Sequence, residues 1–378
     1  MTETRIIVSR TALADGSPST VIGGDVKVLN LVMICCEESL PYGPPIETAI
    51  NFLDLICMSY ARYNSSLIGS DGVALENMLI RITVYHAKSL DYPSNKQEWD
   101  AFDGVIIPGS ISAAYDDHMD WINRLHTVIR EEIHLNRRKT LGVCFGHQCF
   151  AHSFKNNTTE KSNVSSNVDE DHVAGGSRHG LAGKCPSGFK IGRKPCHLTA
   201  AGKCLFSDNF GADGVSYQHE KKDSKPTEVL EMLYTHGDMV ETLPSNGISL
   251  GGSSEVPIHA SAYFESDEKA IQFGKYVDLL AKGTSNTTRL RQVLGHYTNC
   301  HGPSSLPYSL TFQAHPEFVA PSGFNVNYKN LAVTLGEKGF ISGKLAKEAW
   351  EDAQQHFEKL LVDSVNAVIV ACVTLGWF

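Results

Sequence analysis

Apolar residues along the first half of the chain fall into two alternating kinds of segment. Continuous apolar runs with Val and Ile predict strands covered on both faces, at 26–36, 78–87, within 99–110 and at 140–144. Apolar residues at helical spacing predict helices at 47–63, 119–135 and 147–154. Strand and helix in alternation predict right-handed βαβ units, so we expect an α/β fold with a doubly wound, mostly parallel sheet flanked by helices.

The pattern changes after the third predicted helix. Residues 155–184 are polar and show little apolar periodicity, which predicts a mobile surface insertion. Short β-like segments follow at 188–199, 228–238, 247–253, 258–264 and 308–318, and helices are expected around 330–339 and within 344–373. Without a repeat or a clear linker, we expect a flexible leader over 1–25, one elaborated domain over 26–318 and a helical extension over 319–378.

The last residues, 364–378, are strongly apolar. This run falls short of the roughly 20 residues that a helix needs to cross a bilayer. We therefore expect a terminal helix docked on the domain and no membrane span, with a weak membrane or partner anchor as the alternative.

Charge and cysteine usage narrow the class of protein. The net charge is −9, and no basic run is longer than NRRK at 136–139. Because nucleic-acid binding needs a clustered cationic face, this composition argues against such a partner and favours small molecules or proteins. Ten cysteines without a regular frame, and an N-terminus without a signal pattern, predict free thiols and a cytoplasmic location.

One cysteine stands where an apolar strand gives way to a helix. Cys144 lies between Gly142 and Gly146 in the sequence TLGVCFGHQ. A nucleophile at the carboxyl end of a strand needs a tight turn with small neighbours, and the following helix N-terminus favours both a thiolate and an oxyanion. The pattern predicts a nucleophile elbow, although a small buried cysteine would give the same letters.

A base for this nucleophile is suggested by the segment YSLTFQAHPEF. His315 ends a predicted strand, Pro316 stops it, and Glu317 is close enough in sequence to orient the imidazole. Alone, His-Pro-Glu is more typical of a strand end with a solvated carboxylate. Beside a cysteine elbow, it indicates a Cys144, His315 and Glu317 triad.

Four sequence segments resemble the signatures of a known family. GVIIPGS, GVCFGHQ, LYTHGDMVETLP and FQAHPEF, in this order, resemble the signature segments of the class I glutamine amidotransferase family, and the stand-alone branch that includes γ-glutamyl peptidases is the most similar pattern. The resemblance spans about 26–318 and implies a flavodoxin-like doubly wound fold. It also implies that Cys144 is the nucleophile, His315 the base and Glu317 the orienting group.

The resemblance assigns further roles to single residues. It implies that the N–H groups of Gly109 and Phe145 form the oxyanion hole. Gln148 would contact the α-amino-acid end of the substrate, and His236 and Gly237 would border the substrate pocket. The polar insertion and the helices after about residue 325 depart from the family pattern and leave the substrate and the oligomeric state open.

The function expected from these residues is hydrolysis of a γ-glutamyl amide, through a γ-glutamyl thioester on Cys144 and without a cofactor. The substrate would be a small γ-glutamyl compound or glutamine. One alternative is a glutaminase subunit that delivers ammonia to a separate synthetase, and another is a non-catalytic binding module. Partnership with a synthetase and self-association both stay open.

A metal site is not expected. His147, Cys149 and His152 are ligand-type residues, but they share one short helix whose first turn is assigned to catalysis, and no second pair has zinc-site spacing. Cys149, Cys35 and Cys36 are predicted to be buried core thiols.

Overall fold

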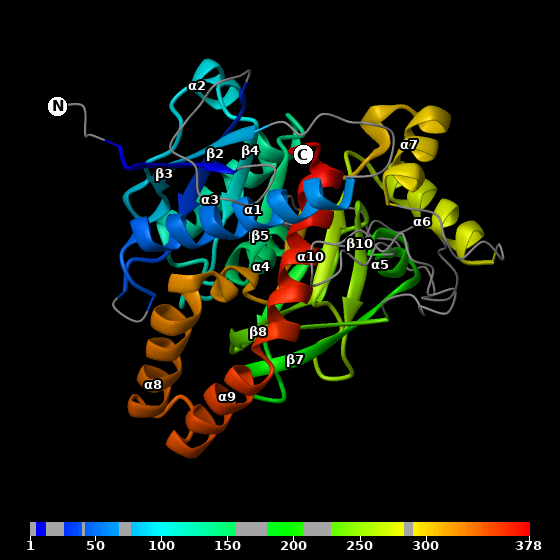
Figure 1. Cartoon of the computed structure of the whole chain (residues 1–378). Coiled ribbons are helices and arrows are strands. Elements are labelled where there is room, and N and C mark those ends of the chain that lie inside the picture. Colours follow the sequence, from blue (N-terminus) through cyan, green and yellow to red (C-terminus); the bar gives the residue numbers. More distant parts are fainter. Residues whose placement is uncertain are drawn as a thin grey trace, which may run out of the picture.

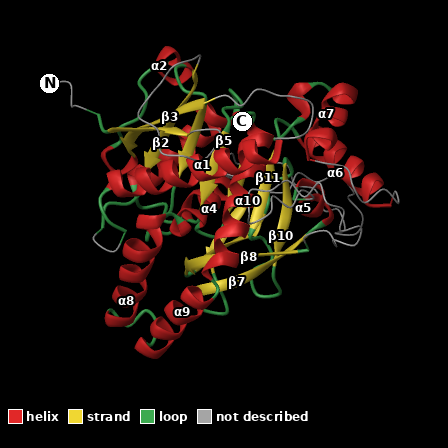
Figure 2. Cartoon of the chain, in the orientation of Figure 1, coloured by secondary structure: helices red, strands yellow, loops and turns green. Residues whose placement is uncertain are grey.

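A ten-stranded mixed sheet organises the part of the chain that the computed structural model describes, namely residues 5–12, 26–39, 42–67, 77–155, 180–206, 228–282 and 290–378. In spatial order its strands are β1 (Ile7–Ala12), β3 (Asn77–His86), β2 (Val26–Cys35), β4 (Gly104–Ile107), β5 (Thr140–Val143), β12 (Ser309–Phe312), β11 (Ala260–Tyr263), β10 (Gly247–Gly252), β7 (Lys190–Leu198) and β8 (Val229–His236). A separate two-stranded sheet pairs β6 (Leu181–Lys184) with β9 (Asp238–Thr242). Figure 2 shows the strands crossing the centre of the molecule between helices.

The parallel half of the sheet has the order expected of a flavodoxin-like fold. Strands β3, β2, β4, β5 and β12 are parallel neighbours, so the chain order along them is second, first, third, fourth, fifth. The strand order reverses between β2 and β4, and ligands of such folds bind outside the carboxyl ends of the strands at this reversal. The predicted α/β sheet flanked by helices is confirmed, and an antiparallel half formed by β11, β10, β7 and β8 extends it.

Helices cover both faces of the parallel half. On one face lie α1 (Pro45–Leu67) and α10 (Phe357–Leu375), which cross in front of the sheet in Figure 1. On the other lie α3 (Asp120–Val128), its π-helical continuation at Ile129–His134, and α4 (Phe145–His152). Strand β2 serves both cores, because Leu31 and Met33 pack with α1 and α10 whereas Val32 and Ile34 pack with α3 and α4. This explains its continuous apolar sequence.

The remaining helices lie around the sheet edges and at the C-terminus. They are α2 (Lys96–Asp100), α5 (Ala200–Leu205), α6 (Asp267–Lys282), α7 (Leu290–His301), α8 (Lys329–Glu337) and α9 (Gly343–Gln355). Helices α6 and α7 were not among the predicted elements. The apolar pattern within 344–373 divides at His356, whose backbone leaves the helical region, and α9 and α10 diverge from there.

Part of the predicted flexible leader forms a strand in the structure. Residues 7–12 form β1, which pairs antiparallel with β3, and Val8 and Ala12 are buried against α1. An ion pair joins Arg10 to Asp54 of α1. The predicted insertion also differs at its end, since residues 181–184 form β6, while 156–179 lie outside the described residues.

The apolar C-terminus packs against the sheet. Trp377 is 1% exposed, and its indole lies so close to Gly104 in β4 that a Cβ there would be 2.3 Å from the ring. Lys27 donates to the Trp377 carbonyl oxygen at 3.3 Å. The expected docked terminal helix is therefore present. Among the described helices, none is long and apolar enough to cross a membrane.

Candidate active site

Cys144 occupies a sharp turn between β5 and α4. Its backbone has φ 50° and ψ −104°, a left-handed conformation that is strained for a residue with a side chain. The turn also forces close packing, since a Cβ on Gly146 would lie 2.1 Å from the Ile107 carbonyl oxygen. A Cβ on Gly142 would lie 2.8 Å from Cγ2 of Thr311. Both predicted glycines are thus required by the geometry of the elbow.

The base candidate lies on the neighbouring strand. Because β12 pairs parallel with β5, their carboxyl ends meet at one edge of the sheet, and His315 follows β12 as Cys144 follows β5. Nδ1 of His315 is 2.7 Å from Oε1 of Glu317. The imidazole also stacks on Phe318, with ring centroids 4.4 Å apart and an interplanar angle of 6°. Glu317 and Phe318 together fix the orientation of the ring.

The neighbours of His315 change its pKa. Burial alone would lower its pKa, but the adjacent Cys144 and Glu317 outweigh burial and raise the pKa to about 10. Among the described residues, Nε2 of His315 has no hydrogen-bond partner of ordinary geometry. With Nδ1 held by Glu317, Nε2 is the nitrogen that can exchange a proton with a bound reactant.

Gly109 and Phe145 flank the same point. A Cβ on Gly109 would lie 2.7 Å from Cε1 of His315 and 3.5 Å from Cβ of Cys144, so the backbone after β4 touches both residues. Phe145 is the first residue of α4, where backbone N–H groups lack partners within the helix. The structure thus brings together the side chains of Cys144, His315 and Glu317 and the two backbones predicted for the oxyanion hole.

The predicted substrate contacts lie on a second wall of the site. Gln148, in the first turn of α4, donates to the Asp238 carbonyl oxygen at 2.9 Å and to Oε1 of Gln313 at 3.2 Å. Nδ1 of His236 is 2.7 Å from the same Asp238 oxygen, and burial lowers the His236 pKa to about 3. Gly237 packs on Phe189. The roles of Gln148, His236 and Gly237 toward substrate stay predictions.

Two residues around the sulfur were missed in the sequence. Nε2 of Gln313 donates to the Cys144 sulfur at 3.7 Å, and the Thr235 carbonyl oxygen lies 3.9 Å from it on the β8 side. Polar residues alternate with buried apolar ones along β12 and beyond, and Gln313 lies on the polar side two residues before His315. That alternation is the signal that could have identified Gln313.

Tyr42 was also missed, and it closes the site from the loop after β2. Its ring centroid is 6.2 Å from that of His315, and burial together with the neighbouring Cys144, Glu317 and Glu37 raises its pKa. The C-terminal part of the chain holds this loop, because Nδ2 of Asn327 donates to the Tyr42 carbonyl oxygen at 3.0 Å. Cys144 itself is 2% exposed.

His147 and Cys149 of α4 pack in the core. Nδ1 of His147 is 2.7 Å from Oγ1 of Thr311 and Nε2 is 3.2 Å from the Ile258 carbonyl oxygen. Cys149 is fully buried, as predicted, and so are Cys35 and Cys36 at 2% and 0% exposure. Within the described ranges, no group of three or more His, Cys, Asp or Glu side chains is arranged to hold a metal ion.

A known protein family matches the part of the chain that contains the elbow. The sequence model of the glutamine amidotransferase class-I family matches residues 73–255, which include the elbow at Cys144. Over these residues, slightly less than half of its length, the chain is similar to the class I glutamine amidotransferase family. His315 and Glu317 lie beyond the matched residues, so their placement beside Cys144 comes from the fold and not from that match.

Two curated relatives share parts of this amidotransferase-like chain. Gamma-glutamyl peptidase 4 of Arabidopsis thaliana is 30% identical over 96 residues, 25% of this chain and 34% of the relative. Gamma-glutamyl peptidase 5 of the same plant is 38% identical over 58 residues, 15% of this chain and 22% of the relative. The matches thus span about a third or less of the length of these relatives.

Solved structures with distant likeness are also found. A glutamine amidotransferase from Thermotoga maritima gives a TM-score of 0.48 at 11% identity, over 90% of this chain and 98% of the other. A glutamine amidotransferase from Methylobacillus flagellatus gives 0.46 at 12% identity, over 91% and 94%.

Proposed function

We propose that this amidotransferase-like protein is a cysteine hydrolase of γ-glutamyl amide bonds. One observation carries the proposal, namely that Cys144 on its strained elbow, the Glu317-oriented His315 and the Gly109 backbone converge at the carboxyl ends of β4, β5 and β12. This arrangement has the parts that acyl transfer needs, which are a nucleophile, an oriented base and backbone donors. The partial likeness to gamma-glutamyl peptidases supports the choice of substrate.

The first half of the reaction transfers the acyl group to sulfur. The Cys144 thiolate adds to the γ-carbonyl carbon, and the N–H groups of Gly109 and Phe145 bind the oxyanion of the tetrahedral intermediate. When the intermediate collapses, the C–N bond breaks and Nε2 of His315 gives its proton to the leaving nitrogen. The raised pKa of His315 suits this step, because the proton needed by the amine is already on the ring at neutral pH.

The second half releases the acid. With its proton gone, His315 takes a proton from a water molecule as that water adds to the thioester carbonyl. The C–S bond then breaks, glutamate leaves, and His315 and Cys144 return to their starting forms. Glu317 holds Nδ1 throughout and stabilises the imidazolium, which gives up its proton in the first half and forms again in the second. The two half-reactions consume one water and require no redox partner.

A substrate panel tests the proposal. The purified chain would be incubated with glutathione, a glutathione conjugate, a γ-glutamyl dipeptide and glutamine, and the products identified by mass spectrometry. We expect free glutamate with at least one of them, no turnover by Cys144→Ser, and turnover within a few-fold of wild type by Cys149→Ser. Cys149 is the matched control because it is a buried thiol on the same helix. Equal activity in Cys144→Ser would disprove the mechanism.

The same panel distinguishes the peptidase from the glutaminase alternative. Ammonia released from glutamine, negligible for the chain alone and raised by a copurifying protein, would favour a subunit that supplies a separate synthetase. Glutamate released with the amine of a peptide substrate would favour the peptidase.

A further inference from the structure

A buried carboxylate lies beside the candidate oxyanion turn, and no step of the mechanism uses it. Glu37 follows β2, and its side chain is 3% exposed. The turn that carries Gly109 follows β4, the neighbour of β2 at the point where the strand order reverses. Glu37 therefore lies in the crevice where flavodoxin-like folds bind their ligands.

One oxygen of Glu37 is committed to the turn after β4. Oε2 accepts a hydrogen bond from Oγ of Ser110 at 2.9 Å and from the backbone N–H of Ile111 at 3.0 Å. Ser110 and Ile111 directly follow Gly109, whose backbone touches Cys144 and His315. A carboxylate just after β2 thus holds the two residues next to a predicted oxyanion donor.

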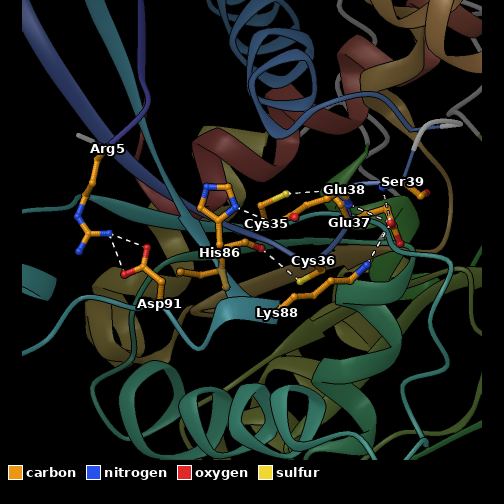
Figure 3. Close-up of polar contacts among 10 residues, drawn as sticks. Arg5, Cys35, Cys36, Glu37, Glu38, Ser39, His86, Lys88 and Asp91 are labelled. Atoms are coloured by element: carbon orange, nitrogen blue, oxygen red, sulfur yellow. Dashed lines mark hydrogen bonds and ion pairs between the residues drawn. The ribbon is translucent and has the colours of Figure 1, made fainter. Parts of the chain in front are cut away.

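The other oxygen anchors Glu37 to its own surroundings. Oε1 accepts from the backbone N–H groups of Glu38 at 2.9 Å and Ser39 at 2.8 Å, and from Nζ of Lys88 at 3.1 Å. Figure 3 shows Lys88 reaching across from the end of β3 to this carboxylate. The bonds to Glu37 thus come from the ends of three adjacent strands, β3, β2 and β4.

These contacts keep Glu37 charged. Burial alone would raise its pKa, but the bonds from the Ile111 and Ser39 amides and the Lys88 ammonium lower it to about 2. Only a carboxylate offers acceptors for all these donors at once, since a glutamine would place an NH₂ group against one set of them. Lys88 compensates a negative charge that would otherwise oppose a nearby oxyanion.

We propose that Glu37 is a positioning residue that holds the turn at 109–111 so that the Gly109 N–H faces the reacting carbonyl. Its effect on turnover rests on the function proposed above, whereas its hold on the turn does not. Oxyanion contacts act in the transition state, so loosening the turn lowers kcat more than it changes KM. A misplaced donor can cost on the order of 100-fold in rate.

Glu37→Gln tests the proposal, with Glu38→Gln as the matched control. Glu38 is the next residue, and its side chain is 44% exposed and faces His86 instead of the turn. In Glu37→Gln we expect faster amide hydrogen exchange in a peptide covering 106–114 and a kcat lowered by about 10- to 100-fold at little-changed KM. We expect Glu38→Gln to match wild type in both. Unchanged exchange in Glu37→Gln would overturn the proposal.

A second variant tests the proposal even if Glu37→Gln fails to fold. Ser110→Ala removes one of the two bonds to Oε2 and leaves the carboxylate paired with Lys88. We expect it to exchange faster at 106–114 and to lose kcat by a smaller factor, and wild-type behaviour would contradict the role of Glu37. Faster exchange with unchanged kcat would show that holding the turn at 109–111 does not contribute to turnover. Faster exchange in a chain without activity on any γ-glutamyl compound would instead refute the proposed function and keep the role of Glu37 in holding the turn.

Discussion

At the scale of single residues, the proposed mechanism gives His315 and Glu317 roles that differ in kind. The imidazole moves protons in both half-reactions, whereas the carboxylate only holds Nδ1 at 2.7 Å. A glutamine at 317 keeps an oxygen that can accept from Nδ1, so it can still orient the ring.

We therefore predict that His315→Ala lowers kcat/KM by roughly 10³- to 10⁴-fold. Glu317→Gln should cause a smaller loss and, because it keeps the size of the side chain, should keep its melting temperature within a few degrees. His315→Ala should still fold, although it removes the ring that stacks on Phe318. Steady-state kinetics on the best substrate of the panel provides the measurement. Wild-type activity in His315→Ala would mean that the base lies elsewhere.

The charge on Glu37 makes stability depend on pH in a defined direction. Its folded-state pKa of about 2 lies below the ordinary value of 4.5, so its contribution is present above pH 4.5 and disappears as the pH falls toward 2. We predict that the stability difference between wild type and Glu37→Gln is largest near neutral pH and shrinks as the pH falls through that window.

Urea unfolding of both proteins at a series of pH values measures this difference, with Glu38→Gln as the reference. A difference that stays constant down to the lowest pH would show that the carboxylate is not the stabilising form.

At the scale of elements, short sequence motifs predicted the features that a few neighbouring residues define. The elbow was predictable because Gly142 and Gly146 lie two residues on either side of Cys144. The atoms that leave no room for a Cβ there belong to Thr311 and Ile107, which the sequence pattern does not identify. Glu37 and Tyr42 were not predictable, because their partners are far away in sequence. The pairing of β2 with β4 brings Glu37 to Ser110, and Tyr42 meets His315, which follows β12. Strand β1 was missed for the same reason, since its structure comes from pairing with β3.

The C-terminal helix gives a stability prediction. Trp377 is 1% exposed and lies against Gly104, so its removal leaves a large cavity between α10 and the sheet. We predict that Trp377→Ala destabilises the fold by about 3–5 kcal/mol. Phe340→Ala is the control, because Phe340 is 63% exposed and should cost little. Equal unfolding midpoints for the two variants in urea would show that the C-terminus does not pack in solution as described here.

At the scale of the whole molecule, the candidate active site is assembled from residues far apart in the chain. Cys144 comes from the parallel half of the sheet, His315 from the strand that joins the two halves, and Tyr42 from a loop held by Asn327 in the C-terminal part. The α/β class followed from apolar patterning, whereas the flavodoxin-like order of the parallel strands was implied by the family resemblance. The antiparallel half followed from neither, because its short strands carry no signal for their spatial order.

The central claim is that Cys144 becomes a γ-glutamyl thioester during turnover. Acid quenching of the chain with its best substrate, followed by peptide mapping by mass spectrometry, looks for this intermediate directly. We predict a γ-glutamyl adduct on the peptide that contains Cys144 in wild type and in Cys149→Ser, more abundant in Glu317→Gln if deacylation is slowed, and absent in Cys144→Ser. Substrate turnover with an adduct on another cysteine, or with an adduct that persists in Cys144→Ser, would contradict the account.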